Sequence, residues 1–159
     1  MQNLQRLNVK DAYRLNHEEP IVVRLEDEIE HVIENFAHHA ELSGIFVVEE
    51  DNRFVGVITR TDLLNWARVK VGAALMSPLE DRSKALRLIA LIHASQVSDI
   101  LRQETKKASV TPDDTLGDAL LTMIETDLVI LPVIDEVRHI LGSLTLSELL
   151  SRTLAENQA

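Results

Sequence analysis

The chain has 159 residues, of which 45% are hydrophobic, so it can form one compact domain or two small lobes with a sizeable core, which excludes a largely disordered protein. It carries 26 acidic against 16 basic residues, and the formal net charge of −10 disfavours nucleic acid as a partner because phosphates require a basic face. The sequence has no cysteine, no signal peptide and no apolar run long enough to cross a bilayer, so we expect a cytoplasmic protein without disulfides or membrane insertion.

The first half of the chain predicts two helices and a strand before its first hairpin. Residues 3–15 have a modest helical pattern, and Pro20 is followed by a short extended run, Ile21-Val22-Val23. Residues 26–41 predict an amphipathic helix, because its apolar residues recur at helical spacing: Ile29, Val32, Ile33 and Phe36.

A hairpin and a further helix follow. Residues 45–48 and 53–58 predict two strands, and Asp51-Asn52 supplies the tight turn between them. The strands contain Val, Ile and Phe side by side rather than alternating with polar residues, which is typical of strands covered on both faces. The next helix begins near Thr59.

The second half follows the same order after a connector. Ser77-Pro78 interrupts the chain, and residues 80–94 predict an amphipathic helix. A short strand at 109–110 is followed by the turn and cap cluster Pro112-Asp113-Asp114-Thr115. The remaining predicted elements are a helix at 115–126, strands at 129–134 and 140–144, and a helix at 147–154.

The two halves are an internal repeat. Residues 47–63 are echoed without a gap by residues 133–149, at an offset of 86 positions. The apolar positions of the helix over 26–41 match those of the helix over 115–126 at an offset of 87. We therefore expect an α/β fold of two β-α-β-β-α units packed as a pseudo-two-fold pair, with a first repeat at 1–76, a helical connector at 77–94 and a second repeat at 95–159. The boundary between such units is a natural place for a ligand.

The chain resembles a cystathionine-β-synthase (CBS) domain pair, also called a Bateman module. The resemblance is carried by residues 47–63 and 110–116, by Leu131-Pro132-Val133-Ile134-Asp135, and by residues 96–101, which resemble the segment that leads into such a repeat. It implies a regulatory, non-catalytic module that binds AMP, ADP, ATP or S-adenosylmethionine in clefts between the repeats. It also implies a homodimer formed through the helices, with no required cofactor.

The resemblance implies a ribose-binding aspartate in the first repeat. In the family, the Asp of a Gly-x-x-Thr-x-x-Asp pattern binds the ribose hydroxyls; here this pattern comprises Gly56, Thr59 and Asp62, with Thr61 assisting. A carboxylate can accept charge-assisted hydrogen bonds from two adjacent hydroxyls. A strand-to-helix junction also suits phosphate, and Arg60 could add a cation beside it.

The same spacing has a purely structural interpretation. Thr59 and Asp62 also match a capping box, in which both side chains satisfy backbone amides of the helix. In the second repeat Glu148 replaces the aspartate, and Thr145 with Glu148 is an even better capping box. The extra methylene moves the carboxylate by about 1.5 Å. We therefore expect the cap to persist at Glu148 and the ribose contact to be lost, which leaves one site per chain, at Asp62.

Adenine requires a flat apolar slot. The candidates are Ile21, Val22 and Val23 of the first repeat, with Leu131 and Pro132 facing them from the second, although plain core packing explains each of these residues equally well.

Other chemistry is less well supported. His31, His38 and His39 lie on one predicted helix but lack a further ligand set, so we expect no metal site. No serine has a convincing base partner and no phosphate-loop pattern occurs, so we expect no catalytic residues. Two alternatives to a ligand sensor remain open: a dimerisation or docking module without a ligand, and a cytoplasmic regulatory fragment of a larger transporter or enzyme.

Overall fold

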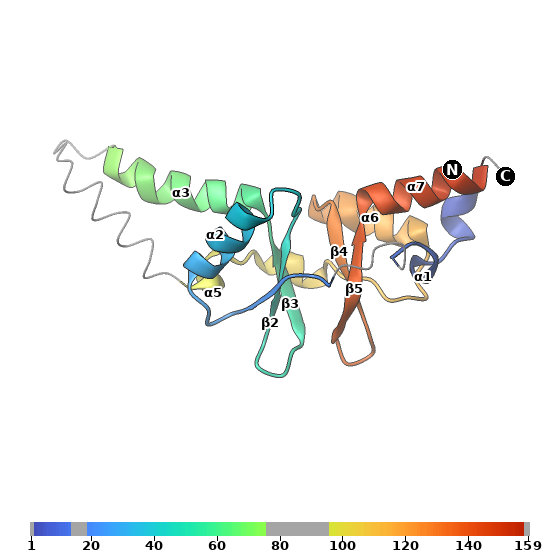
Figure 1. Cartoon of the computed structure of the whole chain (residues 1–159), viewed down its shortest axis with the longest axis horizontal. Helices are drawn as coiled ribbons and strands as arrows, with labels where there is room; N and C mark the ends of the chain where they lie inside the picture. Colours follow the sequence, from blue (N-terminus) through green and yellow to red (C-terminus); the bar gives the residue numbers. More distant parts are fainter. Residues whose placement is uncertain (1, 14–18, 76–95, 158–159) are drawn as a thin grey trace.

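Two lobes lie side by side, and each holds one hairpin and one long helix (Figure 1). The computed structural model describes residues 2–13, 19–75 and 96–157. The predicted connector at 77–94, with its helix over 80–94, lies outside the described residues. The long helices α3 (Arg60–Leu75) and α7 (Leu146–Asn157) extend in opposite directions along one edge of the molecule (Figure 1).

The first lobe is a three-stranded sheet with helices. It contains β1 (Val22–Arg24), α2 (Ile29–His38), β2 (Ile45–Val48), β3 (Phe54–Ile58) and α3. β1 is parallel to β2, and β2 is antiparallel to β3. Every residue of β2 and β3 is buried, as their continuous apolar runs predict.

The second lobe repeats this order. It contains α6 (Leu116–Thr126), β4 (Ile130–Ile134), β5 (Ile140–Thr145) and α7. In place of β1 it has a single parallel bridge, from Val110 to Val133. Asn52 and Arg138, 86 positions apart, have φ of 64° and 68° at the two hairpin turns. The predicted duplication therefore extends to the backbone geometry of the turns.

The segments that lead into each repeat lie on the opposite lobe. η1 (Gln2–Gln5) and α1 (Val9–Ala12) pack against the second lobe, where the Val9 N–H donates to the Asp114 carbonyl (2.8 Å). α5 (Val97–Ile100) packs against the first lobe, where the Val97 N–H donates to the Asp27 carbonyl (2.8 Å). This second contact explains why α2 begins at Ile29 rather than at residue 26, since the residues before it hold α5. η3 (Gln103–Lys107) then runs along β3.

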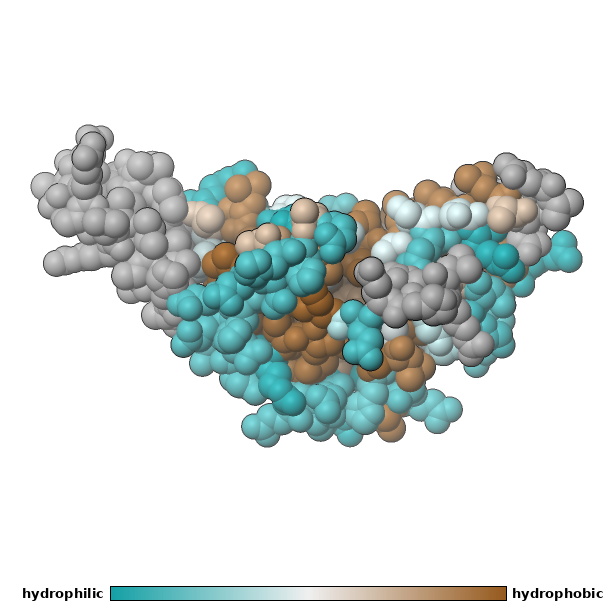
Figure 2. Space-filling model, viewed as in Figure 1, coloured by the Kyte–Doolittle hydropathy of each residue, from teal (hydrophilic) through white to brown (hydrophobic). Residues whose placement is uncertain are grey.

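The lobes share one core. Phe46, Phe54 and Val57 of the first sheet belong to the same buried cluster as the strands and helices of the second lobe. The Phe46 and Phe54 rings meet edge to face, 6.2 Å apart. A second cluster fills the first lobe beneath α2. We call the surface where the lobes meet the inter-repeat boundary; Figure 2 shows hydrophobic residues in the middle of the visible face, between the hydrophilic surfaces of the lobes.

Candidate functional site

The predicted capping box at the start of α3 is present. The Thr59 N–H and Oγ1 both donate to Asp62 Oδ2, at 2.8 and 3.2 Å, and the Asp62 N–H donates to Thr59 Oγ1 at 3.3 Å. The Asp62 side chain is only 4% exposed. One carboxylate oxygen therefore satisfies the helix terminus, which leaves Oδ1 for another partner.

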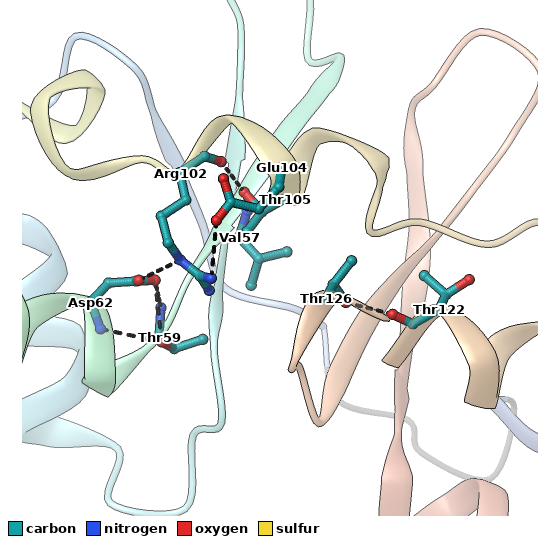
Figure 3. A network of polar contacts seen from close by, with 8 residues as sticks. All are labelled: Val57, Thr59, Asp62, Arg102, Glu104, Thr105, Thr122 and Thr126. Atoms are coloured by element: carbon teal, nitrogen blue, oxygen red, sulfur yellow. Dashed lines mark hydrogen bonds and ion pairs between the residues drawn. The ribbon is translucent and has the colours of Figure 1, made fainter. Parts of the chain in front are cut away.

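That partner is Arg102, which sequence reasoning missed. Its Nε lies 2.7 Å from Asp62 Oδ1, and its Nη1 lies 3.5 Å from Glu104 Oε1 (Figure 3). Arg102 follows the segment over 96–101 that resembles a family lead-in, but nothing in the spacing links it to a helix 40 residues earlier. Both oxygens of the predicted ribose-binding carboxylate are thus occupied within the chain.

Arg60 is also occupied. Its guanidinium donates to four carbonyl oxygens at the end of α2 and just beyond it, those of Phe36, His39, Ala40 and Leu42, at 2.8–3.3 Å. It also lies 4.7 Å from the centre of the Phe36 ring. The side chain that we expect to meet a phosphate instead completes the C-terminus of α2. Its neighbour Thr61 is exposed.

The second repeat has the same cap, but the second oxygen of its carboxylate accepts no hydrogen bond from the described residues. The Thr145 N–H and Oγ1 donate to Glu148 Oε1, at 3.0 and 2.8 Å, and the Glu148 N–H donates to Thr145 Oγ1 at 3.2 Å. The predicted cap at Glu148 is therefore confirmed. Within the described part of the chain, Glu148 Oε2 is buried and accepts no hydrogen bond. A buried carboxylate oxygen without a donor is energetically costly.

A cavity of ≈ 450 Å³ lies at the inter-repeat boundary beside Thr145. Residues of both repeats line it, and this size is suited to a small ligand. Its apolar lining includes Ile21, Phe46 and Ile130, its neutral polar lining includes Asn35, Ser143 and Thr145, and its titratable lining is Glu19, His39 and Glu41.

Only one predicted adenine contact lines this cavity. Ile21 does so, whereas Val22 is 41% exposed and Val23 is buried beneath α2. Leu131 and Pro132 are buried within β4. The β4–β5 register places Ile130 opposite Thr145, at the strand end where α7 begins, and it is Ile130 that reaches the cavity. Sequence reasoning located the strand but not the residue at its open end.

A family model described as the CBS domain matches residues 9–68 and 97–154, more than half of the chain. The chain belongs to the CBS domain family. The two matched segments are the two structural repeats, each with its lead-in helix.

Solved CBS structures share the whole fold. A CBS domain-containing protein from Thermotoga maritima has a TM-score of 0.73 and 25% identity, and the match covers 94% of this chain and 95% of that one. CBSX2 from Arabidopsis thaliana, in complex with AMP, has a TM-score of 0.66 and 22% identity over 95% and 98% of the two chains. The CBS pair of protein MJ0100, in complex with 5′-methylthioadenosine and S-adenosyl-L-methionine, has a TM-score of 0.61 and 20% identity over 94% and 97%.

Each CBS repeat contributes one capped helix start, and we call the surroundings of Asp62 and of Glu148 the two half-sites. The repeat offset matches Thr122 and Thr126 of α6 to Asn35 and His39, which line the cavity. Figure 3 shows this threonine pair across the inter-repeat boundary from Asp62. Their hydroxyls donate to carbonyls of α6 itself, at 3.0 and 2.6 Å. The half-sites are thus equivalent in fold and different in chemistry.

The described residues of the CBS pair contain neither a cluster of metal ligands nor a helix that could span a membrane. His31, His38 and His39 are exposed on or just after α2, and no three His, Asp or Glu side chains among the described residues gather as metal ligands do. None of the helices in residues 2–13, 19–75 and 96–157 is both long and apolar enough to span a bilayer.

Proposed function

We propose that this CBS pair is a non-catalytic, cytoplasmic regulatory module that binds an adenosine-containing ligand at the inter-repeat boundary. The observation that carries the proposal is the cavity beside Thr145, which is lined by both repeats. A ligand there contacts both repeats at once, so it favours one relative placement over another. The free energy available for signalling is the difference in its affinity for the two placements.

The chemistry of the cavity suits a nucleoside. Ile21, Phe46 and Ile130 offer an apolar surface for the base. Ser143 and Thr145 offer hydroxyls that can exchange hydrogen bonds with a ribose. The complexes of CBSX2 with AMP and of the MJ0100 pair with S-adenosylmethionine support the same ligand class.

This placement differs from the sequence-based expectation, which favours Asp62. Asp62 lines none of the three cavities formed by residues 2–13, 19–75 and 96–157. Its Oδ1, the oxygen that the cap does not use, is paired with Arg102. A ligand at Asp62 stays a prediction that requires Arg102 to move.

Thermal unfolding with added ligand tests the proposal. Ligand that binds only the folded chain raises the Tm, and a concentration of 100 times Kd stabilises by about 2.7 kcal/mol. We expect such a rise with at least one of AMP, ADP, ATP and S-adenosylmethionine. Ser143→Val, which gives the second repeat the residue of the first at this position, should weaken the effect several-fold because it removes a cavity hydroxyl.

Ser147→Ala is the matched control, because Ser147 is exposed at the start of α7 and does not line the cavity. It should leave the ligand-induced rise in Tm unchanged. No rise with any of the four ligands at millimolar concentration would contradict the proposed function. An equal rise in native protein and Ser143→Val would contradict the placement of the ligand.

Self-association is a second candidate role, and an exposed apolar surface supports it. Leu121 and Ile124 on α6 are 55% and 69% exposed, and Leu150 and Leu154 on the adjacent α7 are 38% and 61% exposed. The repeat offset matches Leu121 and Leu154 to the charged Glu34 and Arg68 of the first repeat. We propose a homodimer in which the α6–α7 surfaces of two copies face each other, because a two-fold axis brings identical apolar patches together.

Sedimentation velocity tests this proposal. Leu121→Glu together with Ile124→Glu should convert the native dimer to a monomer, because burying charge at an apolar interface is unfavourable. Leu64→Glu is the control, since Leu64 is 56% exposed on α3 and occupies the position of Leu150 in the first repeat. It should leave the dimer intact. A native chain that sediments as a monomer at high concentration would contradict the proposed homodimer.

A further inference from the structure

The turn of the second hairpin borders a groove that the proposed ligand site does not use. The groove has a volume of ≈ 460 Å³ and is lined by residues 111–113, 134–137 and 141, so it lies between the β4–β5 turn and the residues that precede α6. None of the described residues that line it also lines the cavity beside Thr145. The turns of both hairpins lie at the edge of the molecule opposite α3 and α7 (Figure 1), and we call this feature the turn groove.

The first repeat has an equivalent groove with different chemistry. Its volume is ≈ 480 Å³, and it is lined by Leu25, Glu26, Glu49, Glu50 and Asp51. The repeat offsets of 86 and 87 match all five residues to residues that line the turn groove. Three of the four acidic positions stay acidic in the second repeat. The fourth changes, because Val137 replaces Asp51 at the hairpin turn.

Two exposed apolar side chains distinguish the turn groove from its counterpart. Val137 and Leu141 are 52% and 50% exposed. Val55, the counterpart of Leu141, is only 9% exposed because it packs in the core cluster of the first lobe. Polar residues and glycine or proline dominate turns, so a valine at this position is not explained by turn chemistry. Neighbouring exposed apolar residues with a polar surround are typical of an interaction surface.

The turn that carries Val137 is held in place. Asp135 Oδ1 accepts hydrogen bonds from the N–H groups of Val137 and His139, both at 2.9 Å. The Arg138 guanidinium donates to the Phe54 carbonyl through Nε and Nη2, at 3.2 and 3.1 Å, which ties the second turn to the first lobe. A surface that is already ordered loses little conformational entropy when a partner binds. The exposed apolar residues are therefore pre-organised for docking.

The charge of the turn groove indicates what it would bind. Asp113, Asp135 and Glu136 are its acidic residues, and none of the described residues that line it is basic. Lys10 offsets one of these charges, since its Nζ lies 3.2 Å from Asp113 Oδ1. The chain's net charge of −10 disfavours a second copy as the occupant of an acidic groove. Positive charge next to an apolar side chain complements both parts of the lining.

We propose that the turn groove docks a segment of a partner protein in which an apolar side chain lies between Lys or Arg residues. The apolar side chain packs against Val137 and Leu141, and its cationic neighbours face Asp135 and Glu136. A groove whose apolar walls are half exposed does not enclose a small molecule, because such sites bury most of the ligand's surface. It does suit the side chains of an extended segment. This interaction is independent of the adenosine site.

Selection from a random peptide library displayed on phage tests the proposal. Peptides that bind the native chain should contain apolar residues next to Lys or Arg, and fluorescence anisotropy of the synthesised peptides should show binding that weakens as salt rises. Val137→Asp, which gives the second turn the residue of the first, should weaken this binding by roughly ten-fold because it removes an apolar contact. Attraction by charge alone would instead make Val137→Asp bind more tightly. Glu136→Gln should weaken binding several-fold.

Glu50→Gln is the matched control, because Glu50 is the first-repeat counterpart of Glu136 and the change in charge is the same. It should leave the affinity unchanged. The proposal is overturned by a library that yields no binding peptide, by peptides without Lys or Arg, by equal or tighter binding to Val137→Asp, or by equal losses in Glu136→Gln and Glu50→Gln. If Val137→Asp does not fold, Leu141→Ser takes its place, with the same expected loss.

Sedimentation velocity distinguishes the proposed occupant from a second copy. Val137→Asp should leave the oligomeric state of the native chain unchanged. A native dimer that this substitution converts to a monomer would show that the turn groove holds a second copy, and it would overturn the choice of partner. None of these failures affects the adenosine proposal, because its test measures ligand-induced changes in Tm.

Discussion

At the scale of single residues, the start of each repeat's last helix shows what spacing can and cannot predict. The Thr-x-x-Asp and Thr-x-x-Glu patterns predict caps, and both caps are present because they depend only on residues three positions apart. Arg102 and the carbonyls that bind Arg60 were not predictable, because these contacts join segments that only the tertiary fold brings together. The cap therefore uses Oδ2 of Asp62, and Oδ1 pairs with Arg102.

Gly56 supports a prediction at this scale. A Cβ added there would lie 2.5 Å from Leu101 Cδ1 and 2.8 Å from Thr105 Oγ1, because the segment over 101–105 packs directly on β3. Gly56→Ala should therefore lower the free energy of unfolding by about 1–3 kcal/mol. Urea unfolding measures this as a lower midpoint at an unchanged slope.

Gly142 occupies the same position in the second repeat and is the matched control. Among residues 2–13, 19–75 and 96–157, a Cβ there would meet only the Tyr13 ring, at 3.1 and 3.2 Å. Gly142→Ala should cost less than about 1 kcal/mol, because the contacts with the half-buried Tyr13 ring are longer, whereas Thr105 Oγ1 beside Gly56 is held by two hydrogen bonds. Equal losses in the two variants would show that the close packing on Gly56 is not what limits the substitution.

At the scale of elements, the sequence predicts the helices and hairpins. It does not predict that the segment leading into each repeat packs on the opposite lobe. Apolar periodicity predicts α2 and α6, and the unbroken apolar runs predict the buried hairpins. The weak helical pattern over 3–15 gave no sign that α1 completes the opposite lobe. Val9 and Val97 are both fully buried, each in the core cluster of the other repeat.

This exchange predicts where a core truncation is felt. Val97→Ala should destabilise the chain by about 1–3 kcal/mol, and hydrogen exchange should increase first at the amides of α2, in the first lobe. Val9→Ala, its counterpart, should instead increase exchange first in α6. If each substitution loosened its own repeat, or both lobes equally, the lead-ins would not act as structural parts of the opposite lobes.

At the scale of the whole molecule, duplication produces two equivalent half-sites and sequence divergence makes them unequal. The repeat itself was predictable, because 17 residues recur in register, and the family match confirms it. Which half-site is open was not predictable. The sequence favours Asp62 on residue type, whereas the structure pairs Asp62 with Arg102 and opens a cavity beside Thr145. Whether a half-site is open depends on how side chains pack across the inter-repeat boundary. The sequence pattern of a single repeat does not predict that packing.

A crystal structure of the native chain grown with one equivalent of adenosine per chain would show which half-site the ligand occupies first. We expect the base to lie against Ile21 and Ile130 and the ribose beside Thr145, with Arg102 still paired to Asp62. Adenosine bound at Asp62 with the Thr145 cavity empty would contradict this expectation.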